Sequence, residues 1–248
     1  MSAYVLALVA GAVTGLALGA LGGGGSVLAV PALIYLLGFT PAAATTASLA
    51  IVTVTSATAL AAHARADTVE WRAGAVFAAA GLVPATLGGA VSGYVPSALL
   101  TGAFAVVAGL ASYRMLRPSV SVLEGVPVRP VQVAQAGAGL GAVTGVLGVG
   151  GGFLAVPALV NVVGLRMRAA VGTSLLVITV NSLAALLARA GTAARVDWAL
   201  VAPFAAAAIL GAWDGKRLAG RVSGSRLQRI FAWVLLGVAL LMLADAMV

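Results

Sequence analysis

The chain has 248 residues, of which 62% are hydrophobic and only 8% charged, and its mean hydropathy is +1.14. This composition is typical of an integral membrane protein and excludes an ordinary soluble domain. The formal net charge of +8 does not indicate a nucleic-acid partner, because the basic residues stand singly or in small groups at the ends of apolar segments. A sequence without cysteine has no disulfide or thiolate metal site.

The first apolar region runs from Tyr4 to Gly38 and contains four consecutive glycines followed by Pro31. A single helix through it would be about 50 Å long, whereas the hydrocarbon core is about 30 Å thick. Glycine costs about 1 kcal/mol of helix propensity and proline donates no backbone hydrogen bond, so we expect a break between Gly22 and Pro31. A re-entrant hairpin and two short spans both remain open, because both return the chain to the side from which it entered.

Uninterrupted apolar helices are expected after the first broken region. In the first half they lie at about 41–62, 72–93 and 97–115. A proline-rich linker follows, and a second glycine-broken region then runs from Gln132 to Gly164. Three more helices are expected at about 167–188, 197–215 and 226–247.

The two halves are copies of one unit. A shift of 126 residues aligns the segment 11–38 with 137–164 and places Pro31 on Pro157 and Ser48 on Ser174. A shift of 127 residues then places Phe104 on Phe231. Chance matches between small residues would not keep this order and spacing. We predict an all-α polytopic membrane protein that forms one membrane domain, with repeats at 1–116 and 132–248 joined by the linker 117–131.

The distribution of lysine and arginine predicts how the repeats are oriented. If each broken region crossed the membrane once, the fourteen basic residues would divide evenly between the two sides. If each region returns to its own side, only Arg189 and Arg195 lie opposite the other twelve, which is a clear positive-inside bias. We therefore expect inverted repeats in a cell inner membrane, with the linker cytoplasmic and both termini outside. Interrupted segments in corresponding places of inverted halves are a sequence sign of a transporter site near the midplane.

The chain resembles the TauE/SafE family of sulfite and sulfonate exporters, also called the toluene-sulfonate uptake permease family. The resemblance rests on the doubled signature "LGGGGSVLAVPAL" and "LGVGGGFLAVPAL", with "GTSL" at 172–175 and the degenerate "ASLA" at 47–50. It covers essentially the whole chain. It implies a membrane transporter of small sulfur-containing anions such as sulfite or organosulfonates, with export coupled to a proton gradient or the membrane potential.

The glycine-rich breaks are the first candidate site. Backbone amides exposed within the bilayer need a partner, and amides that precede a helix suit an oxyanion. Close helix packing is the alternative, which we expect for Gly11, Gly15 and Gly19 because of their four-residue spacing. The candidate substrate-binding residues in the breaks are Gly22, Gly23, Gly24, Gly25 and Ser26 in the first copy and Gly148, Gly150, Gly151 and Gly152 in the second.

Polar side chains near the breaks complete the candidate site. Ser48 and Thr55 share one helix face, as do Ser174 and Asn181, and such faces serve either an anion or a neighbouring helix. The full set outside the glycine runs is Tyr35, Ser48, Thr55, Asn161, Thr173, Ser174 and Asn181. Ionisable residues are sparse in the spans, and we place His63 in an interfacial loop.

We therefore expect a secondary transporter that exports a small anion by alternating access around a midplane site. A passive anion channel and a non-transporting membrane scaffold are the alternatives. No carboxylate pair, catalytic triad or metal-ligand spacing appears in the sequence, so we expect no enzymatic activity, no metal and no cofactor. The expected partners are the anionic substrate and the lipid bilayer. The anion, its direction, the coupling ion and the choice between a monomer and a homodimer stay open.

Overall fold

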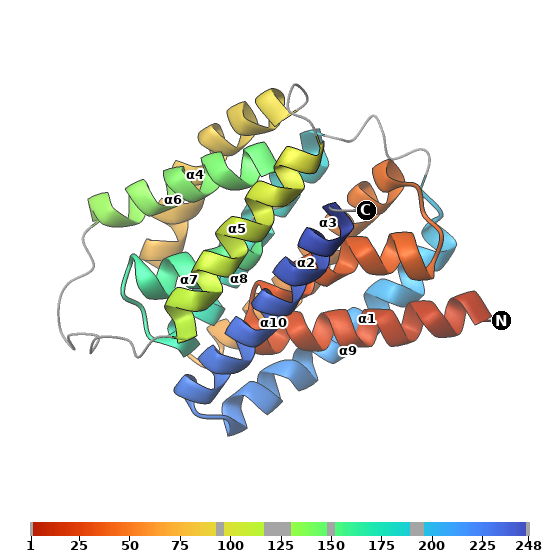
Figure 1. Cartoon of the computed structure of the whole chain (residues 1–248). Coiled ribbons are helices and arrows are strands. Elements are labelled where there is room, and N and C mark those ends of the chain that lie inside the picture. Colours follow the sequence, from red (N-terminus) through yellow and green to blue (C-terminus); the bar gives the residue numbers. More distant parts are fainter. Residues whose placement is uncertain (1, 93–96, 117–129, 148–151, 189–195, 247–248) are drawn as a thin grey trace.

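The computed structural model describes residues 2–92, 97–116, 130–147, 152–188 and 196–246, and it contains only helices within these ranges. Figure 1 shows their arrangement. In the first half they are α1 (Ser2–Leu21), α2 (Gly24–Pro31), the π-helical segment η1 (Ala32–Leu36), α3 (Pro41–Ala64), α4 (Trp71–Ser92) and α5 (Ser97–Leu116). In the second half they are α6 (Pro130–Leu147), α7 (Gly152–Asn161), α8 (Met167–Ala188), α9 (Trp198–Arg221) and α10 (Gly224–Ala246).

Several of these helices are long and apolar enough to cross a membrane. In the described part of the chain, four reach that length, at Ala3–Leu21, Ala43–Ala64, Met167–Leu187 and Trp198–Arg221. Two shorter apolar stretches lie at Trp71–Leu87 and Ala105–Leu116. The expected polytopic, all-α membrane protein is confirmed at this level.

The first break is narrower than we predicted. Helix α1 ends at Leu21 and α2 begins at Gly24, so only Gly22 and Gly23 lie outside a helix, and the expectation that the break extends to Pro31 is wrong. Pro31 is the last residue of α2 and continues directly into η1. A local π-helical turn takes up the hydrogen-bond defect that a proline introduces, which is how membrane helices tolerate one.

Two of the long helices begin at capping residues that the sequence supplies. Thr40 precedes α3, with Pro41 in the first helical turn, and the Thr40 hydroxyl accepts a 3.4 Å hydrogen bond from the amide of Ala43. Asp197 precedes α9, and its carboxylate accepts a 3.0 Å hydrogen bond from the amide of Ala199. Both caps satisfy an amide that the first turn would leave unpaired.

The most extensive helix contacts join the two halves. Helix α1 packs against α9, and α6, its counterpart in the second repeat, packs against α4, the counterpart of α9 (Figure 1). Small residues make these interfaces. A methyl group added to Gly15 would overlap the carbonyl oxygen of Ala208, and one added to Gly141 would overlap that of Gly81. Backbones that approach this closely are typical of membrane helix pairs.

The packing role expected for Gly11, Gly15 and Gly19 is confirmed. A methyl group on these residues would overlap, in turn, the carbonyl oxygens of Phe204, Ala208 and Ala212. The residue numbers of these partners increase as those of the glycines increase, so α1 and α9 run parallel. Gly137 and Gly141 meet the backbone of Phe77 and Gly81 in the same order, so α6 and α4 also run parallel.

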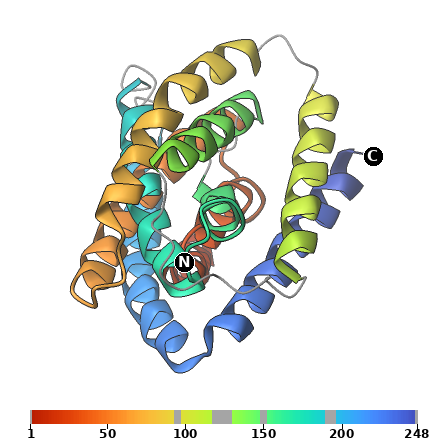
Figure 2. The same ribbon diagram turned by 90° about the vertical axis from the view of Figure 1, so that its left-hand side faces the viewer.

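The short helices lie inside the bundle. Figure 2 shows α7 within a ring of longer helices. In α7 the side chains of Leu154, Ala155, Val156 and Leu159 are at most 3% exposed. Helices α5 and α10 form one side of the ring, where Ser112 donates a 2.7 Å hydrogen bond to the carbonyl of Ala232. A helix that is apolar and buried on several faces is a core element.

The α1–α9 interface yields the first prediction. In Gly15→Ala the new methyl group pushes against backbone that has no rotamer with which to move away, so we expect the free energy of unfolding to fall by about 1–3 kcal/mol. Thermal unfolding in detergent measures the change.

The matched control is Gly109→Ala in α5, where an added Cβ meets no atom within 4 Å. This control should unfold within about 1 kcal/mol of the wild type. Equal melting temperatures for Gly15→Ala and the wild type would contradict the close approach of the two backbones.

Candidate transport site

The first break is a tight reversal of the chain. Gly22 has φ +75°, a left-handed conformation that glycine adopts without steric cost. Its amide donates a 2.8 Å hydrogen bond to the carbonyl of Leu18, and the amide of Gly23 donates a 3.1 Å bond to Leu21. Helix α2 then runs back along α1, where a methyl group on Gly25 would overlap the carbonyl oxygen of Thr14. The amides of Gly22 and Gly23 are therefore already hydrogen-bonded to carbonyl groups at the end of α1.

The break of the first repeat faces helices of the second. An added Cβ at Gly22 would overlap Ser174 Oγ on α8 and lie 3.1 Å from Val156 Cγ2 on α7. Ser174 Oγ in turn donates a 2.8 Å hydrogen bond to the carbonyl of Val171 in its own helix. The structure thus brings together two predicted site residues, Gly22 and Ser174, at a buried junction between the halves.

The "GTSL" stretch fastens this junction to the loop between α3 and α4. A methyl group on Gly172 would overlap the carbonyl oxygen of Thr68. Thr173 Oγ1 accepts a 3.0 Å hydrogen bond from the amide of Glu70, which lies just before α4. Thr173 is 0% exposed, so its hydroxyl has a structural partner in this conformation.

Most hydroxyl groups along α3 and α8 are satisfied locally. Ser48 Oγ donates to the carbonyl of Thr45 at 2.9 Å, and Thr53 Oγ1 donates to Leu49 at 2.7 Å. A hydrogen bond between side chains also joins the two helices, with Thr179 Oγ1 2.9 Å from Ser56 Oγ. Hydroxyl groups that bond a carbonyl in their own helix stay compatible with a lipid environment.

Two buried polar atoms have no such partner. Thr55 Oγ1 on α3 and Asn181 Oδ1 on α8 lack a hydrogen bond within the described part of the chain, and Thr55 is only 2% exposed. The shift of 126 residues that aligns the repeats places Thr55 on Asn181. A buried polar atom without a partner costs about 1–3 kcal/mol. That both copies carry this cost at the same position indicates a place kept for water or a polar solute.

His63 is a residue whose position the sequence did not reveal. We expected it in an interfacial loop, but it is 6% exposed at the end of α3, which contradicts that expectation. Its Nε2 lies 3.4 Å from the carbonyl oxygen of Gly19, and its Nδ1 lies 3.0 Å from Thr68 Oγ1. Lys216 on α9 donates a hydrogen bond to the neighbouring carbonyl of Ala62. The sequence has a single histidine, so no pattern of spacing could predict that His63 lies beside the first break.

The remaining predicted residues are dispersed or not described. Tyr35 on η1 is 73% exposed at the outside of the bundle, and Asn161 lines a groove between α5, α6 and α7. Gly152, at the start of α7, is buried. Gly148, Gly150 and Gly151 lie outside the described residues, as do the side-chain surroundings of Gly24 and Ser26.

The candidate site contains few charges. The ion pair between Arg217 and Asp214, at 3.3 Å, lies on the exposed surface of α9. No group of three or more His, Asp or Glu side chains that could hold a metal occurs among the residues described. An anion at the break would therefore meet backbone dipoles, hydroxyl groups and an amide rather than a buried cation.

Comparisons with known proteins identify the family of the chain. Residues 7–242 match the family model described as sulfite exporter TauE/SafE. Two proteins of Xylella fastidiosa, from strains 9a5c and Temecula1, are each named probable membrane transporter protein and are 32% identical over 97% of this chain and 95% of their own length. A Bacillus subtilis protein named probable membrane transporter protein YunE is 24% identical over 89% of this chain and 88% of its own length. No solved structure matches the chain significantly.

The geometry of Gly22 yields the second prediction. Gly22→Ala forces a left-handed alanine, at about 1–2 kcal/mol, and also overlaps Ser174. Gly38 has φ +70° but no atom within 4 Å of an added Cβ, so Gly38→Ala incurs only the first cost. We expect Gly22→Ala to lower the melting temperature more than Gly38→Ala.

A double variant isolates the contact. Removing the serine oxygen in Ser174→Ala should recover part of the stability that Gly22→Ala loses, measured as a double-mutant cycle of unfolding free energies. Strict additivity of the two substitutions would show that Gly22 and Ser174 do not touch.

Proposed function

The chain belongs to the TauE/SafE sulfite exporter family of membrane transporters, and on this basis we propose that it exports small sulfur-containing anions by alternating access. The proposed site lies between α3 and α8, at the level of Thr55 and Asn181, about 10 Å along α8 from the first break at Gly22. The observation that carries this proposal is the pair of buried, unpartnered polar atoms at the equivalent positions Thr55 and Asn181. A scaffold protein has no reason to keep both.

The site would hold an anion without a fixed positive charge. The Thr55 hydroxyl donates to an anion directly, whereas the unpartnered Asn181 Oδ1 is an acceptor, so Asn181 would bind the anion through its Nδ2 amide or through a water held at Oδ1. The start of α2 adds backbone amides. Ser174 lies against Gly22, and Asn181 lies two turns further along the same face of α8, a rise of about 10 Å. A row of dipoles of this kind binds an anion weakly enough to release it, which a transporter requires.

Inverted repeats are part of the proposal. Gly25 packs on Thr14, so α2 runs back along α1, and His63 at the end of α3 meets Gly19 near the end of α1. Helix α3 is thus parallel to α1, α4 returns in the opposite direction, and α6 runs parallel to α4. This order supports halves of opposite orientation, the arrangement in which one half rocks against the other around a central site.

The proposed orientation follows the basic residues. Arg65 and Lys216 lie at the same end of the bundle as the C-terminal ends of α3 and α9, and the positive-inside rule places this end in the cytoplasm. The linker 117–131 would then be cytoplasmic and both termini external, with 1–116 and 132–248 as the two transmembrane repeats.

A channel with the same site is the second candidate function. Because a channel needs no alternating gate, flux through it would not show counterflow. Liposomes preloaded with unlabelled sulfite should accumulate labelled sulfite against its gradient if the protein alternates, and should only equilibrate if it is a channel.

The third prediction separates function from stability. In Thr55→Val and in Asn181→Leu a buried atom without a partner is replaced by an apolar group, so the free energy of unfolding should stay the same or rise. Loss of one hydrogen bond to a charged substrate should slow sulfite or sulfonate efflux from proteoliposomes roughly tenfold or more.

Thr86→Val is the matched control, because the Thr86 hydroxyl donates a 2.8 Å hydrogen bond to the carbonyl of Val83 within α4. Efflux by this variant should equal that of the wild type. Wild-type efflux by both Thr55→Val and Asn181→Leu would remove these positions from the transport path.

The fourth prediction tests the orientation. The sequence has no cysteine, so single cysteines can be introduced without background, at Ser2→Cys near the N-terminus and at Ser121→Cys in the linker. A membrane-impermeant maleimide should label Ser2→Cys on intact spheroplasts and Ser121→Cys only after permeabilisation. The opposite labelling would invert the orientation, and equal labelling from one side would reject inverted halves.

A further inference from the structure

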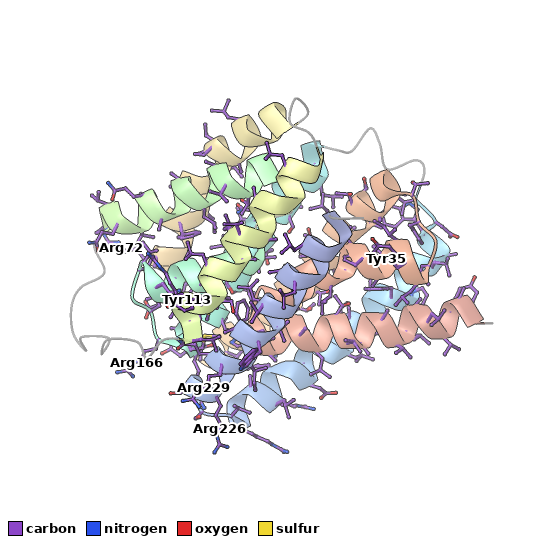
Figure 3. All side chains as sticks on the ribbon, in the orientation of Figure 1. Tyr35, Arg72, Tyr113, Arg166, Arg226 and Arg229 are labelled. Carbon is purple, nitrogen blue, oxygen red and sulfur yellow. The ribbon has the colours of Figure 1, made fainter. Side chains whose placement is uncertain are left out.

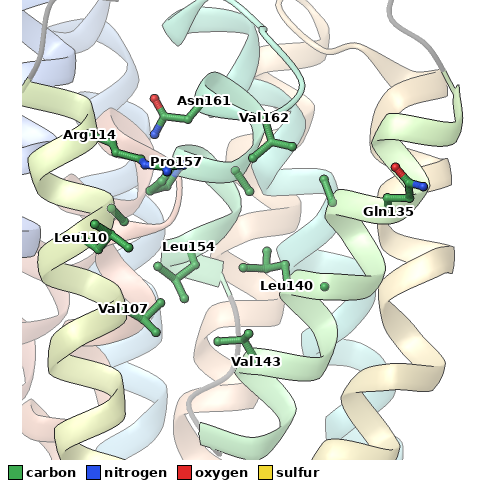
Figure 4. Close-up of a pocket in the computed structure, with 14 residues that line it drawn as sticks. Val107, Leu110, Arg114, Gln135, Leu140, Val143, Leu154, Pro157, Asn161 and Val162 are labelled. Atoms are coloured by element: carbon green, nitrogen blue, oxygen red, sulfur yellow. The ribbon is translucent and has the colours of Figure 1, made fainter.

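A groove on the outside of the bundle lies apart from the proposed transport site. It has a volume of about 340 Å³ and is formed by α5, α6 and α7. Its walls are aliphatic, with Leu110 on α5, Leu140 on α6 and Leu154 and Pro157 on α7. Figure 4 shows these side chains facing the groove, with Val107 and Val143 toward its lower end. The volume lies within the usual range of ligand pockets, about 300–1,000 Å³.

The rim of the groove is exposed and apolar. Leu110 and Val162 are each 55% exposed, and Val143 is 37% exposed. In a chain of membrane helices, such side chains face lipid acyl chains rather than water. The groove therefore opens toward the bilayer.

One end of the groove carries a cation. Arg114 lies in the last turn of α5, next to the exposed Tyr113 that Figure 3 labels. Its side chain reaches toward α7 near Asn161 (Figure 4). The lining residues include no Asp or Glu, and among the described residues Arg114 has no hydrogen bond or ion pair. Gln135 on α6 and Asn161 on α7 are the other polar groups of the lining. The groove thus combines long apolar walls with a positive head.

The other repeat lacks this polar end. The alignment of the repeats places Gln135 on Val9 and Asn161 on Tyr35, and the shift of 127 residues places Arg114 on Leu241. The packing of the bundle does not need a cation or an amide at these places, because the equivalent positions carry valine, tyrosine and leucine. The positive-inside rule accounts for Arg114 at this end of inverted halves, but it does not account for the two amides beside Arg114, which point to a ligand on that side.

We propose that this groove binds an anionic phospholipid, with an acyl chain along the aliphatic walls and the headgroup phosphate at Arg114. A guanidinium pairs well with phosphate, and Gln135 and Asn161 offer further donors. A small inorganic anion would leave the walls unfilled, and a neutral lipid would leave the cation unpaired. Basic pockets between membrane helices on the cytoplasmic side are a general form of anionic-lipid site.

The leaflet of this lipid rests on the proposed orientation, which places Arg114 at the cytoplasmic surface, where anionic lipids gather. Lipid binding in detergent does not depend on orientation or on transport. Failure of the lipid site and failure of the proposed function are therefore distinguishable.

The test is native mass spectrometry of the full chain, purified in mild detergent and supplied with phosphatidylglycerol or with phosphatidylethanolamine of the same acyl chains. The wild type should retain phosphatidylglycerol in preference to phosphatidylethanolamine. Arg114→Gln should retain about fivefold less phosphatidylglycerol, while Arg114→Lys should retain most of it. Gly139→Leu fills the groove, since an added Cβ there meets no atom within 4 Å, and should lower the retention of both lipids.

The control is Arg229→Gln on α10, which removes an exposed arginine elsewhere and should leave retention unchanged. Thermal unfolding without added lipid checks that each variant is folded. If Arg114→Gln does not fold, the retention of phosphatidylglycerol by Arg114→Lys and by Gly139→Leu still tests the proposal. Arg114→Lys should retain most of the lipid and Gly139→Leu should lose it, and equal retention by the two variants would contradict the site.

Several results would overturn the proposal. They are equal retention of phosphatidylglycerol by Arg114→Gln and the wild type, equal retention of the two lipids by the wild type, and an equal loss in Arg229→Gln. Thermal stabilisation by glycerol phosphate as large as that by the whole lipid would assign the site to a free phosphate. Displacement of the lipid by an organic sulfonate would assign it to substrate.

Discussion

The close approach of small residues across the two halves is the constraint on which the rest of the structure depends. Helix α1 reaches the backbone of α9 because Gly11, Gly15 and Gly19 have no side chain there, and Gly137 and Gly141 let α6 reach α4 in the same way. Lipid tails are as apolar as the side chains they contact, so burial of apolar surface cannot hold these helices together. Contact between backbones takes that role, and along α1 it extends to Gly19, three residues before the first break at Gly22.

The packing of α1 on α9 and of α6 on α4 decides which segments lie in the center of the bundle. Each outer arm of a broken region is fastened to the opposite half, so the short arms α2 and α7 lie inside (Figure 2). Gly22 then meets Ser174, while "GTSL" is bound to the loop before α4 through Thr173 and Glu70. In this dry setting most hydroxyl groups bond a carbonyl in their own helix. Among the described residues, the Thr55 hydroxyl and the Asn181 amide oxygen are buried without a partner, and these are the groups for which we propose contact with a transported anion or its water.

The features that the two repeats share and the features that differ between them support different proposals. The breaks, the small-residue interfaces and the unpartnered polar positions occur in both copies, which suits the alternating mechanism that we propose. Arg114, Gln135 and Asn161 occur in one copy and lie in a groove open to lipid. The lipid and the substrate are therefore proposed for separate places, one outside the bundle and one within it.

The sequence by itself determined the membrane class, the repeat and the packing role of the four-spaced glycines, because length, hydropathy and spacing are local properties of the chain. It also predicted the ends of the long helices to within two residues, except that α9 continues to Arg221 instead of ending at 215. It also located the break, but it extended the break too far, since a proline weakens a helix in isolation and the π-helical turn at 32–36 accommodates it only in context. The tertiary structure alone decided which hydroxyl groups are satisfied, that His63 is buried beside Gly19, and that Tyr35 and Asn161 lie at the outside. Those outcomes depend on which helix of the other half lies opposite, and no spacing within one helix contains that information.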